Sequence, residues 1–264
     1  MASDSIDEVR GWLAEAPHIA VLTGAGMSAE SGIPTFRDVL TGLWARFDPQ
    51  QLASPEGFAA DPALVWDWYA SRRAGVIATE PNAGHRALAD FEHRHPGRLG
   101  VITQNVDDLH QRAGSENVIR LHGDLLEDRW FDACRRHARG GTVCDPASAE
   151  LGSPPACGEC GNRVCPGVVW FGEALPVAAF EAAEQLARRC AVMLVVGTSG
   201  AVHPAAGLAY TARRAGAKVV IVNPQPSELD ALALRQLQGT AAKLLPRLLA
   251  KESPGPGNAT GGLA

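Results

Sequence analysis

Short apolar runs alternate with helical segments along this chain, and this alternation restricts the fold more than any other feature of the sequence. The runs have the length of buried strands and end at turn residues; they cover residues 18–22, 99–103, 118–121, 192–196 and 218–222. Helical patterns separate them, most regularly over residues 178–189 and 205–214. Strands alternating with helices form a parallel sheet, since each connection must cross one face of the sheet. The sequence therefore predicts an α/β fold with a Rossmann-like doubly wound parallel sheet.

The remaining segments complete this organisation. Ser5 and Glu8 have capping-box spacing, which predicts a helix from about residue 6 to 16. Asp61 and Pro62 open a helix to about residue 73, another follows Pro81, and a last one covers residues 241–250. A strand resumes at residues 168–171 after a stretch rich in Cys, Gly and Pro. We expect residues 1–123 and 167–250 to form the Rossmann-like domain, residues 124–166 a small Cys-rich module, and residues 251–264 a disordered tail.

Charge and hydropathy narrow the class of protein. The 264 residues carry a formal net charge of −5, whereas a general nucleic-acid binder usually has a basic stripe. No uninterrupted apolar run approaches the roughly 18–20 residues of a membrane span. The first residues lack the basic-then-apolar layout of a signal peptide. We therefore expect a cytoplasmic protein, a monomer, with neither a nucleic-acid nor a membrane partner.

The cysteines are crowded into one segment. Five of the six occur within 32 residues, at Cys134, Cys144, Cys157, Cys160 and Cys165. Without a secretory signal, such a cluster indicates a metal site rather than a disulfide framework.

A glycine-containing turn follows the first strand. Gly24 and Gly26 would let the backbone approach a pyrophosphate, although a tight turn without a ligand is the simpler interpretation of a lone G-x-G. The third glycine of the dinucleotide fingerprint is absent, since Ala29 or Glu30 stands in its place, and the acidic residue expected about 20 residues on has no clear candidate at a strand end. An ordinary dehydrogenase is therefore disfavoured.

Six longer strings carry a family resemblance. Residues 24–38 read Gly-Ala-Gly-Met-Ser-Ala-Glu-Ser-Gly-Ile-Pro-Thr-Phe-Arg-Asp, and residues 103–110 read Thr-Gln-Asn-Val-Asp-Asp-Leu-His. Leu-His-Gly at 121–123, Val-Val-Trp-Phe-Gly-Glu at 168–173, Val-Gly-Thr-Ser at 196–199 and Val-Asn at 222–223 follow in the same order. Together they resemble the signatures of the sirtuins, the NAD-dependent protein deacylases.

The resemblance implies the reaction and its partners. NAD would be a co-substrate, and acyl-lysine-containing proteins would be the substrates. The acyl oxygen attacks the nicotinamide ribose, nicotinamide leaves, and a histidine acts as general base while the acyl group moves to ADP-ribose. His122, in the Leu-His-Gly string, matches this base, and an imidazole that titrates near neutrality suits the task.

The resemblance also implies two sets of binding residues. NAD would contact Gly24, Ala25, Gly26, Ser28, Ile33, Thr35, Phe36, Arg37, Gln104, Asn105, Asp107, Gly197, Thr198, Ser199, Asn223 and Ala241. The acyl-lysine peptide would lie along the strand that contains Val168, Phe171 and Gly172. Such binding uses mainly backbone hydrogen bonds, which give weak sequence specificity.

Two residues predict the acyl group. Tyr69 and Arg72 are three apart on a predicted helix and so share one face. A guanidinium beside a phenol can hold a carboxylate. On spacing alone a solvated arginine and a core tyrosine would be the simpler interpretation. Tyr-x-x-Arg, however, matches the class III sirtuins, which remove succinyl, malonyl and glutaryl groups. We therefore expect acidic acyl groups to be preferred, with acetyl also accepted.

The zinc module of the family is incomplete in this chain. Cys157 and Cys160 form one Cys-x-x-Cys pair, but the first pair is missing because Cys134 lies one residue late. In one interpretation Cys134, Cys144, Cys157 and Cys160 hold structural zinc; Cys134 with His137 is a variant of it. In the other, zinc is lost, and the insert is either held by packing of Trp130 and Phe131 or is partly disordered.

Two alternative functions use the same scaffold. One is an ADP-ribosyltransferase or NAD glycohydrolase, and the other is a non-catalytic NAD- or ADP-ribose-binding module. The presence of His122 together with Tyr69 and Arg72 favours the deacylase, because glycohydrolysis needs no acyl pocket.

Overall fold

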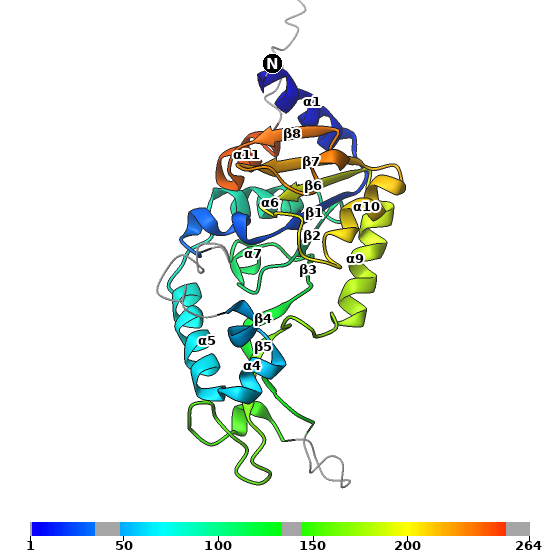
Figure 1. Cartoon of the computed structure of the whole chain (residues 1–264). Coiled ribbons are helices and arrows are strands. Elements are labelled where there is room, and N and C mark those ends of the chain that lie inside the picture. The colour runs from blue at the N-terminus through cyan, green and yellow to red at the C-terminus, as the bar shows by residue number, and fades with distance from the viewer. Residues whose placement is uncertain (1, 35–47, 134–143, 252–264) are drawn as a thin grey trace, which may run out of the picture.

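Six parallel strands form the larger of two lobes in the computed structural model, which describes residues 2–34, 48–133 and 144–251 (Figure 1). Their spatial order is β3-β2-β1-β6-β7-β8. They are β1 (Ile19–Thr23), β2 (Leu99–Thr103), β3 (Val118–Arg120), β6 (Val192–Val196), β7 (Lys218–Asn223) and β8 (Arg235–Gln238). Every residue of β1, β2 and β6 is buried, as expected for strands covered on both faces.

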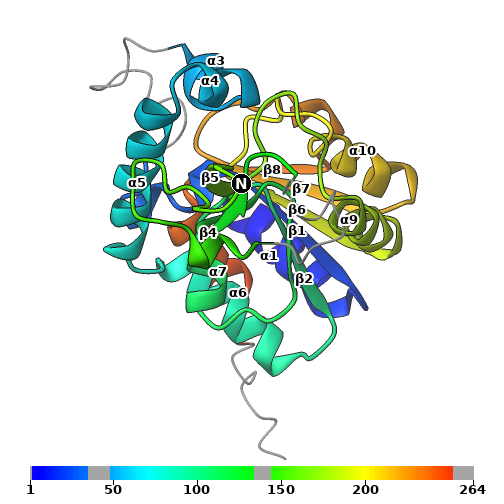
Figure 2. The same cartoon turned by 90° about the horizontal axis from the view of Figure 1, so that it is seen from below.

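Helices cover both faces of this sheet. α1 (Ala2–Glu15), α6 (Ala83–Arg94) and α11 (Ala241–Leu248) contribute to one apolar core. α9 (Val177–Arg189) and α10 (Gly207–Arg214) contribute to the other, and they lie side by side in Figure 2. The predicted doubly wound α/β fold is therefore confirmed.

The smaller lobe has a separate core. Antiparallel strands β4 (Gly123–Trp130) and β5 (Val164–Val168) pack with α3 (Pro49–Leu52), α4 (Pro55–Ala60) and α5 (Pro62–Ile77). Phe58, Trp68 and Trp170 are at most 2% exposed in this core. Ser54 and Asp61 begin α4 and α5, because each side chain accepts a hydrogen bond from the first helical turn. The Cys-rich insert thus packs on helices that precede it by some 70 residues in sequence.

Several predicted boundaries agree with the structure and others do not. The strands predicted at 99–103 and 192–196 have those bounds. The predicted start of the first helix is wrong: α1 begins at Ala2, so Ser5 lies inside it. α5 continues one turn beyond residue 73. The strand predicted at 168–171 is wrong, because β5 covers Val164–Val168 and residues 169–171 lie outside any strand. The sequence did not predict β4, β8, α4 or the short α7 (Leu109–Arg112), and most of the loop expected at 34–52 lies outside the described residues.

The topology places a switch point at the carboxyl ends of β1 and β6. From β1 the chain adds β2 and β3 on one side and β6, β7 and β8 on the other. Ligands of open parallel sheets bind where the strand order reverses in this way. Single-turn 3-10 helices η1 (Ala25–Met27) and η2 (Ala29–Ser31) follow β1 at this point; two others, η3 (Pro146–Ser148) and η4 (Asp230–Leu232), lie elsewhere. Among the described helices, none is both long and apolar enough to cross a membrane.

Candidate functional site

Two glycine-containing loops meet at the carboxyl ends of β1 and β6. The Gly24 N–H donates to the Val196 carbonyl, and the Gly26 N–H donates to the Gly197 carbonyl at 2.8 Å. A Cβ on Gly26 would lie 2.7 Å from Gly197 Cα. Gly197 has φ +63°, and a Cβ there would lie 2.4 Å from the Met27 nitrogen. The loops can therefore pack this closely only with glycine at these positions.

Polar side chains tie these loops to the neighbouring strands. The Gln104 amide donates to Thr198 Oγ1 at 3.3 Å, and the Asn223 amide donates to the Thr198 carbonyl at 3.2 Å. Ser199 is exposed beside them, as is Ala25 in the first loop. Ala241 is buried at the start of α11, where the next N–H donates to Glu30 of η2. The structure thus brings these predicted NAD contacts from the first, second and last thirds of the chain to one edge of the sheet.

A buried polar cluster lies next to the first glycine-containing loop. Ser28 donates to Asp107 at 2.9 Å and accepts from the Asn105 amide at 3.2 Å. All three residues are at most 8% exposed. Burial raises the pKa of Asp107, although hydrogen bonds from Leu109 and Ser28 oppose this. Ile33 is half-buried and donates its N–H to the Ser28 carbonyl. The cluster offers both donors and acceptors, as an amide ligand requires.

His85 and His110 form a pair next to this cluster, and the sequence did not predict a functional role for either. The Asn82 N–H donates to His85 Nδ1, so the hydrogen of His85 is on Nε2, which faces Ser28 Oγ at 3.5 Å. The ring of His85 contacts that of His110 edge-on, with 4.8 Å between centroids. Burial lowers the pKa of His85 to about 4 and that of His110 to about 3. The sequence signal that could have found His85 is Asn82, three residues earlier at the start of α6, because this is the spacing of a capping box.

His122 lies at the junction of the two lobes, immediately before β4. Its Nδ1 is 2.8 Å from the Gln104 carbonyl oxygen. A carbonyl only accepts, so Nδ1 carries the hydrogen and Nε2 keeps its lone pair in the neutral ring. Burial lowers the pKa of His122 despite the opposing effect of this hydrogen bond. The arrangement supplies an oriented base that is neutral at physiological pH.

Tyr69 and Arg72 lie together on α5, as their spacing predicted. Tyr69 is 6% exposed, and its hydroxyl accepts a hydrogen bond from Trp170 Nε1 at 3.0 Å. The guanidinium of Arg72 stacks on Trp68 at 4.7 Å. Burial lowers the pKa of Arg72, while the nearby Tyr69 and Asp107 oppose the shift. Within the described part of the chain, no carboxylate forms an ion pair with Arg72.

The segment predicted to bind the peptide is hydrogen-bonded to neighbouring backbone on both sides of Trp170. Val168 is buried in β5, and the next N–H donates to the His122 carbonyl. Phe171 is 42% exposed, and its N–H donates to the Ala53 carbonyl. Gly172 has φ +90°, which favours glycine. The segment therefore connects the histidine, the acyl-pocket residues and the smaller lobe.

Three cysteines converge in the insert. The sulfurs of Cys144, Cys157 and Cys160 all lie within 4.8 Å of one another. Backbone N–H groups of Cys160 and Glu159 lower the pKa of Cys157, which favours the thiolate. Cys165 is instead buried in the smaller core, where burial raises its pKa to about 12. The fourth predicted ligand, Cys134, lies outside the described residues.

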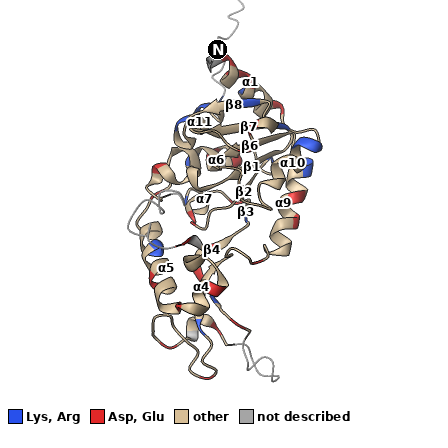
Figure 3. Cartoon of the chain, viewed as in Figure 1, with Lys and Arg blue, Asp and Glu red and all other residues tan. Residues whose placement is uncertain are grey.

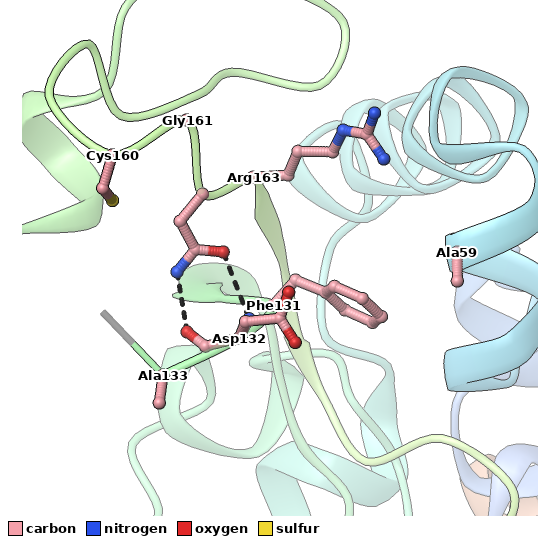
Figure 4. Close-up of a pocket in the computed structure, with 8 residues that line it drawn as sticks. Ala59, Phe131, Asp132, Ala133, Cys160, Gly161 and Arg163 are labelled. Carbon is pink, nitrogen blue, oxygen red and sulfur yellow. Dashed lines mark hydrogen bonds between the residues drawn. The ribbon is translucent and has the colours of Figure 1, made fainter. Parts of the chain in front are cut away.

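Aromatic packing also supports the insert. Phe131 lies 4.8 Å from Phe58 between ring centroids, and the Trp130 indole donates to the Cys144 carbonyl. A cavity of about 160 Å³ lies beside Phe131, where the Asn162 amide bridges both backbone groups of Asp132 (Figure 4). The described part of the insert is therefore held by both aromatic contacts and a thiol cluster.

Of the other predicted NAD contacts, Thr35, Phe36 and Arg37 lie outside the described residues.

Comparison with known proteins agrees with this geometry. Residues 24–204 match the Sir2 family. The chain is 51% identical over 243 residues to an NAD-dependent protein deacylase of Ralstonia nicotianae, covering 92% of this chain and 95% of the relative. It is 54% identical over 245 residues to an NAD-dependent protein deacylase of Methylococcus capsulatus, with the same coverage.

Solved structures are similar over the same range. A Sir2 homolog–NAD complex has a TM-score of 0.82 and 41% sequence identity, covering 92% of each chain. The structure of Sir2Tm bound to a propionylated peptide has a TM-score of 0.77 and 32% identity, covering 92% of this chain and 97% of the other.

Proposed function

Because this chain belongs to the Sir2 family, we propose that it is a protein-lysine deacylase with a preference for acidic acyl groups. The relatives that this chain matches over most of their length are NAD-dependent protein deacylases, and this chain has the same activity. The preferred groups would be succinyl, malonyl or glutaryl, with acetyl as a further substrate. The products would be nicotinamide and O-acyl-ADP-ribose.

The glycine loops and the buried cluster fit NAD. The contact of Gly24 and Gly26 with Gly197 brings two backbone segments together at the point where parallel sheets bind dinucleotides. Ser28, Asn105 and Asp107 form a dry polar surface that matches the carboxamide of nicotinamide. When bound, NAD supplies the ribose carbon that receives the acyl oxygen as nicotinamide leaves.

His122 would act as the general base. Its Nδ1–H is held by the Gln104 carbonyl, which leaves Nε2 to take a proton from a ribose hydroxyl. The lowered pKa keeps the ring unprotonated at neutral pH. The base stands between the NAD loops and the peptide strand, because its own carbonyl accepts from Val169.

One observation carries the acidic-acyl preference: a half-buried guanidinium, Arg72, stands beside a buried phenol, and no described carboxylate forms a close ion pair with it, although Asp107 is near enough to influence its pKa. An arginine in such a place is costly unless an anion joins it. The carboxylate of a succinyl group would provide that anion.

The test compares succinyl-lysine and acetyl-lysine peptides in the presence of NAD, with peptide mass and nicotinamide measured together. We expect Arg72→Met to lower kcat/KM for the succinyl peptide by about 100-fold, since a hydrogen bond to a charged group contributes about 1.5–3 kcal/mol. Deacetylation should continue. Arg72→Lys, which keeps the charge but not the bidentate fork, should fall between the two.

Equal losses with both peptides would contradict the acyl preference. Nicotinamide release without deacylation would instead indicate a glycohydrolase or an ADP-ribosyltransferase.

We also propose that the insert holds a structural zinc ion. Cys144, Cys157 and Cys160 are close enough to share one ion, and thiolates are preferred zinc ligands. Cys134 is proposed as the fourth ligand. Zinc here would stabilise the insert and take no part in the reaction.

The substrates are proposed to be acyl-lysine proteins of the cytoplasm, and the enzyme a monomer without nucleic-acid or membrane partners. Basic and acidic residues are interspersed on the helices (Figure 3), in keeping with a surface that is not specialised for nucleic acid. A cysteine cluster that could hold a metal ion is typical of a reducing compartment.

A further inference from the structure

The hydroxyl of Tyr69 has a fixed hydrogen-bonding polarity. Trp170 Nε1 lies 3.0 Å from the Tyr69 oxygen, and an indole nitrogen only donates. The phenol oxygen must therefore accept this bond. The hydrogen of the Tyr69 hydroxyl remains available, because none of the described residues accepts a hydrogen bond from it.

We propose that Trp170 is a specificity-determining positioning residue, which holds the Tyr69 hydroxyl as a donor toward the carboxylate of an acidic acyl group. This inference rests on the proposed function. A carboxylate only accepts hydrogen bonds, so a pocket that recognises it needs donors from every side. Arg72 supplies the charged donors, and Trp170 ensures that Tyr69 supplies another.

Trp170 is itself held rigidly. The indole is 2% exposed, and its ring centroid lies 5.3 Å from that of Phe58. Its backbone N–H donates to Glu173, whose carboxylate is paired with Arg129 at 2.7 and 2.8 Å. The Arg129 guanidinium also lies over the indole at 5.2 Å. The orientation of Tyr69 is thus set by the core of the smaller lobe.

The phenol keeps its hydrogen under working conditions. Burial raises the pKa of Tyr69 to about 12, so the hydroxyl stays protonated at neutral pH. A freely rotating hydroxyl would accept from a neutral amide as easily as it donates to a carboxylate. With one acceptor position occupied by Trp170, the donor role is favoured.

A double-mutant cycle tests this role. Trp170→Phe removes the N–H and keeps an aromatic ring, and Tyr69→Phe removes the hydroxyl. The measured quantity is the ratio of kcat/KM for succinyl-lysine to that for acetyl-lysine. We expect Trp170→Phe to lower this ratio about 3- to 10-fold, mainly through KM for the succinyl peptide, as for the loss of one hydrogen bond. In the Tyr69→Phe background the same change should leave the ratio within about twofold.

Two outcomes would overturn the inference: an unchanged ratio in Trp170→Phe, or an equal fall in both backgrounds. Trp12→Phe, in the larger lobe, is the matched control for loss of an indole. If Trp170→Phe does not fold, Glu173→Gln is the second variant, since it removes the ion pair with Arg129 that supports Trp170 and keeps the hydroxyl of Tyr69; it should lower the ratio as well, and no change would contradict the inference.

Different results would overturn the proposed acyl preference and the proposed role of Trp170. A wild-type enzyme without a succinyl preference, or one indifferent to Arg72→Met, would overturn the proposed function and this inference with it. A preference that depends on Arg72 and Tyr69 but not on Trp170 would overturn the inference alone.

Discussion

His122 shows how one backbone contact decides what a side chain can do. The Gln104 carbonyl can only accept, so it selects the tautomer with hydrogen on Nδ1 and leaves Nε2 as the base. Gln104 is itself placed by its N–H, which donates to the Thr23 carbonyl at the end of β1. The orientation of the proposed base is therefore set by the central strand of the sheet.

The pH dependence of catalysis follows from this environment. A general base works unprotonated, so kcat/KM should fall as the pH drops through the pKa of His122. Burial lowers that pKa from its ordinary value of 6.5, so the acid limb should be centred below pH 6.5. A pH profile of kcat/KM with an acetyl-lysine peptide measures it, and this substrate avoids the titration of a succinyl carboxylate. An acid limb centred above pH 6.5 would contradict the assignment.

At the residue scale, the motifs were predictable and their contacts were not. The positions of His122, Asn105 and Asp107 followed from the family resemblance. The hydrogen bond from Trp170 to Tyr69 joins residues 101 positions apart, and no local pattern encodes such a contact.

At the scale of elements, buried strands were easier to predict than exposed or short ones. β2 and β6 are continuous apolar runs between turns, so their bounds were found directly. β8 has the sequence Arg-Gln-Leu-Gln, with only Leu237 buried, because it is the last strand at the sheet edge. Ser5 satisfied a capping pattern, yet α1 begins three residues earlier. The packing of α4 and α5 on the insert depends on tertiary contacts that periodicity does not record.

The insert combines the two alternatives considered from its sequence, a metal site made of cysteines and support by aromatic packing. Its thiols converge as a metal site would require, and Phe131 packs into the aromatic core as a metal-free module would require. Both forms of support act at the end of the two strands where Trp130 pairs with Val164, and they are compatible.

Zinc content tests the thiol cluster. We expect the purified protein to contain about one zinc ion per chain by elemental analysis, and Cys157→Ala to contain none. A chelator should lower the thermal midpoint of the wild type but not that of Cys157→Ala. Cys190→Ala is the matched control, since this buried cysteine lies at the end of α9; it should retain zinc. A zinc-free wild type, or zinc retained in Cys157→Ala, would show that packing alone holds the insert.

At the scale of the whole molecule, buried ionisable groups gather where the site meets the sheet. His85, His110 and Asp107 are each at most 8% exposed, and Ser28 links His85 to Asp107. His110 Nδ1 has no hydrogen-bond partner in the described structure. The polarity that suits this region to a nicotinamide amide also makes folding sensitive to pH, because protonated imidazoles cannot be solvated there.

The sign of that sensitivity can be worked out. The folded-state pKa values of His85 and His110, about 4 and about 3, lie below the value of 6.5 expected in the unfolded chain. The unfolded state therefore binds more protons below pH 6.5, and the free energy of unfolding decreases as the pH falls toward 4. Each histidine should account for about 2–3 kcal/mol between pH 7 and 4.5. The raised pKa of Asp107 acts in the opposite direction and offsets part of this loss.

Urea unfolding at pH 7, 6, 5 and 4.5 measures the effect. The wild type should lose stability steadily over this range, and His110→Gln should lose about 2–3 kcal/mol less, because one buried imidazole no longer titrates. The variant will be less stable at pH 7 if glutamine packs poorly, but the prediction concerns the slope with pH and not the starting value. His93→Gln, on the exposed side of α6, controls for the introduced amide and should not reproduce the change in slope. A His110→Gln slope equal to that of the wild type would mean that this imidazole is not kept neutral by burial, and would contradict the assignment of a pKa lowered by burial beside the proposed nicotinamide site.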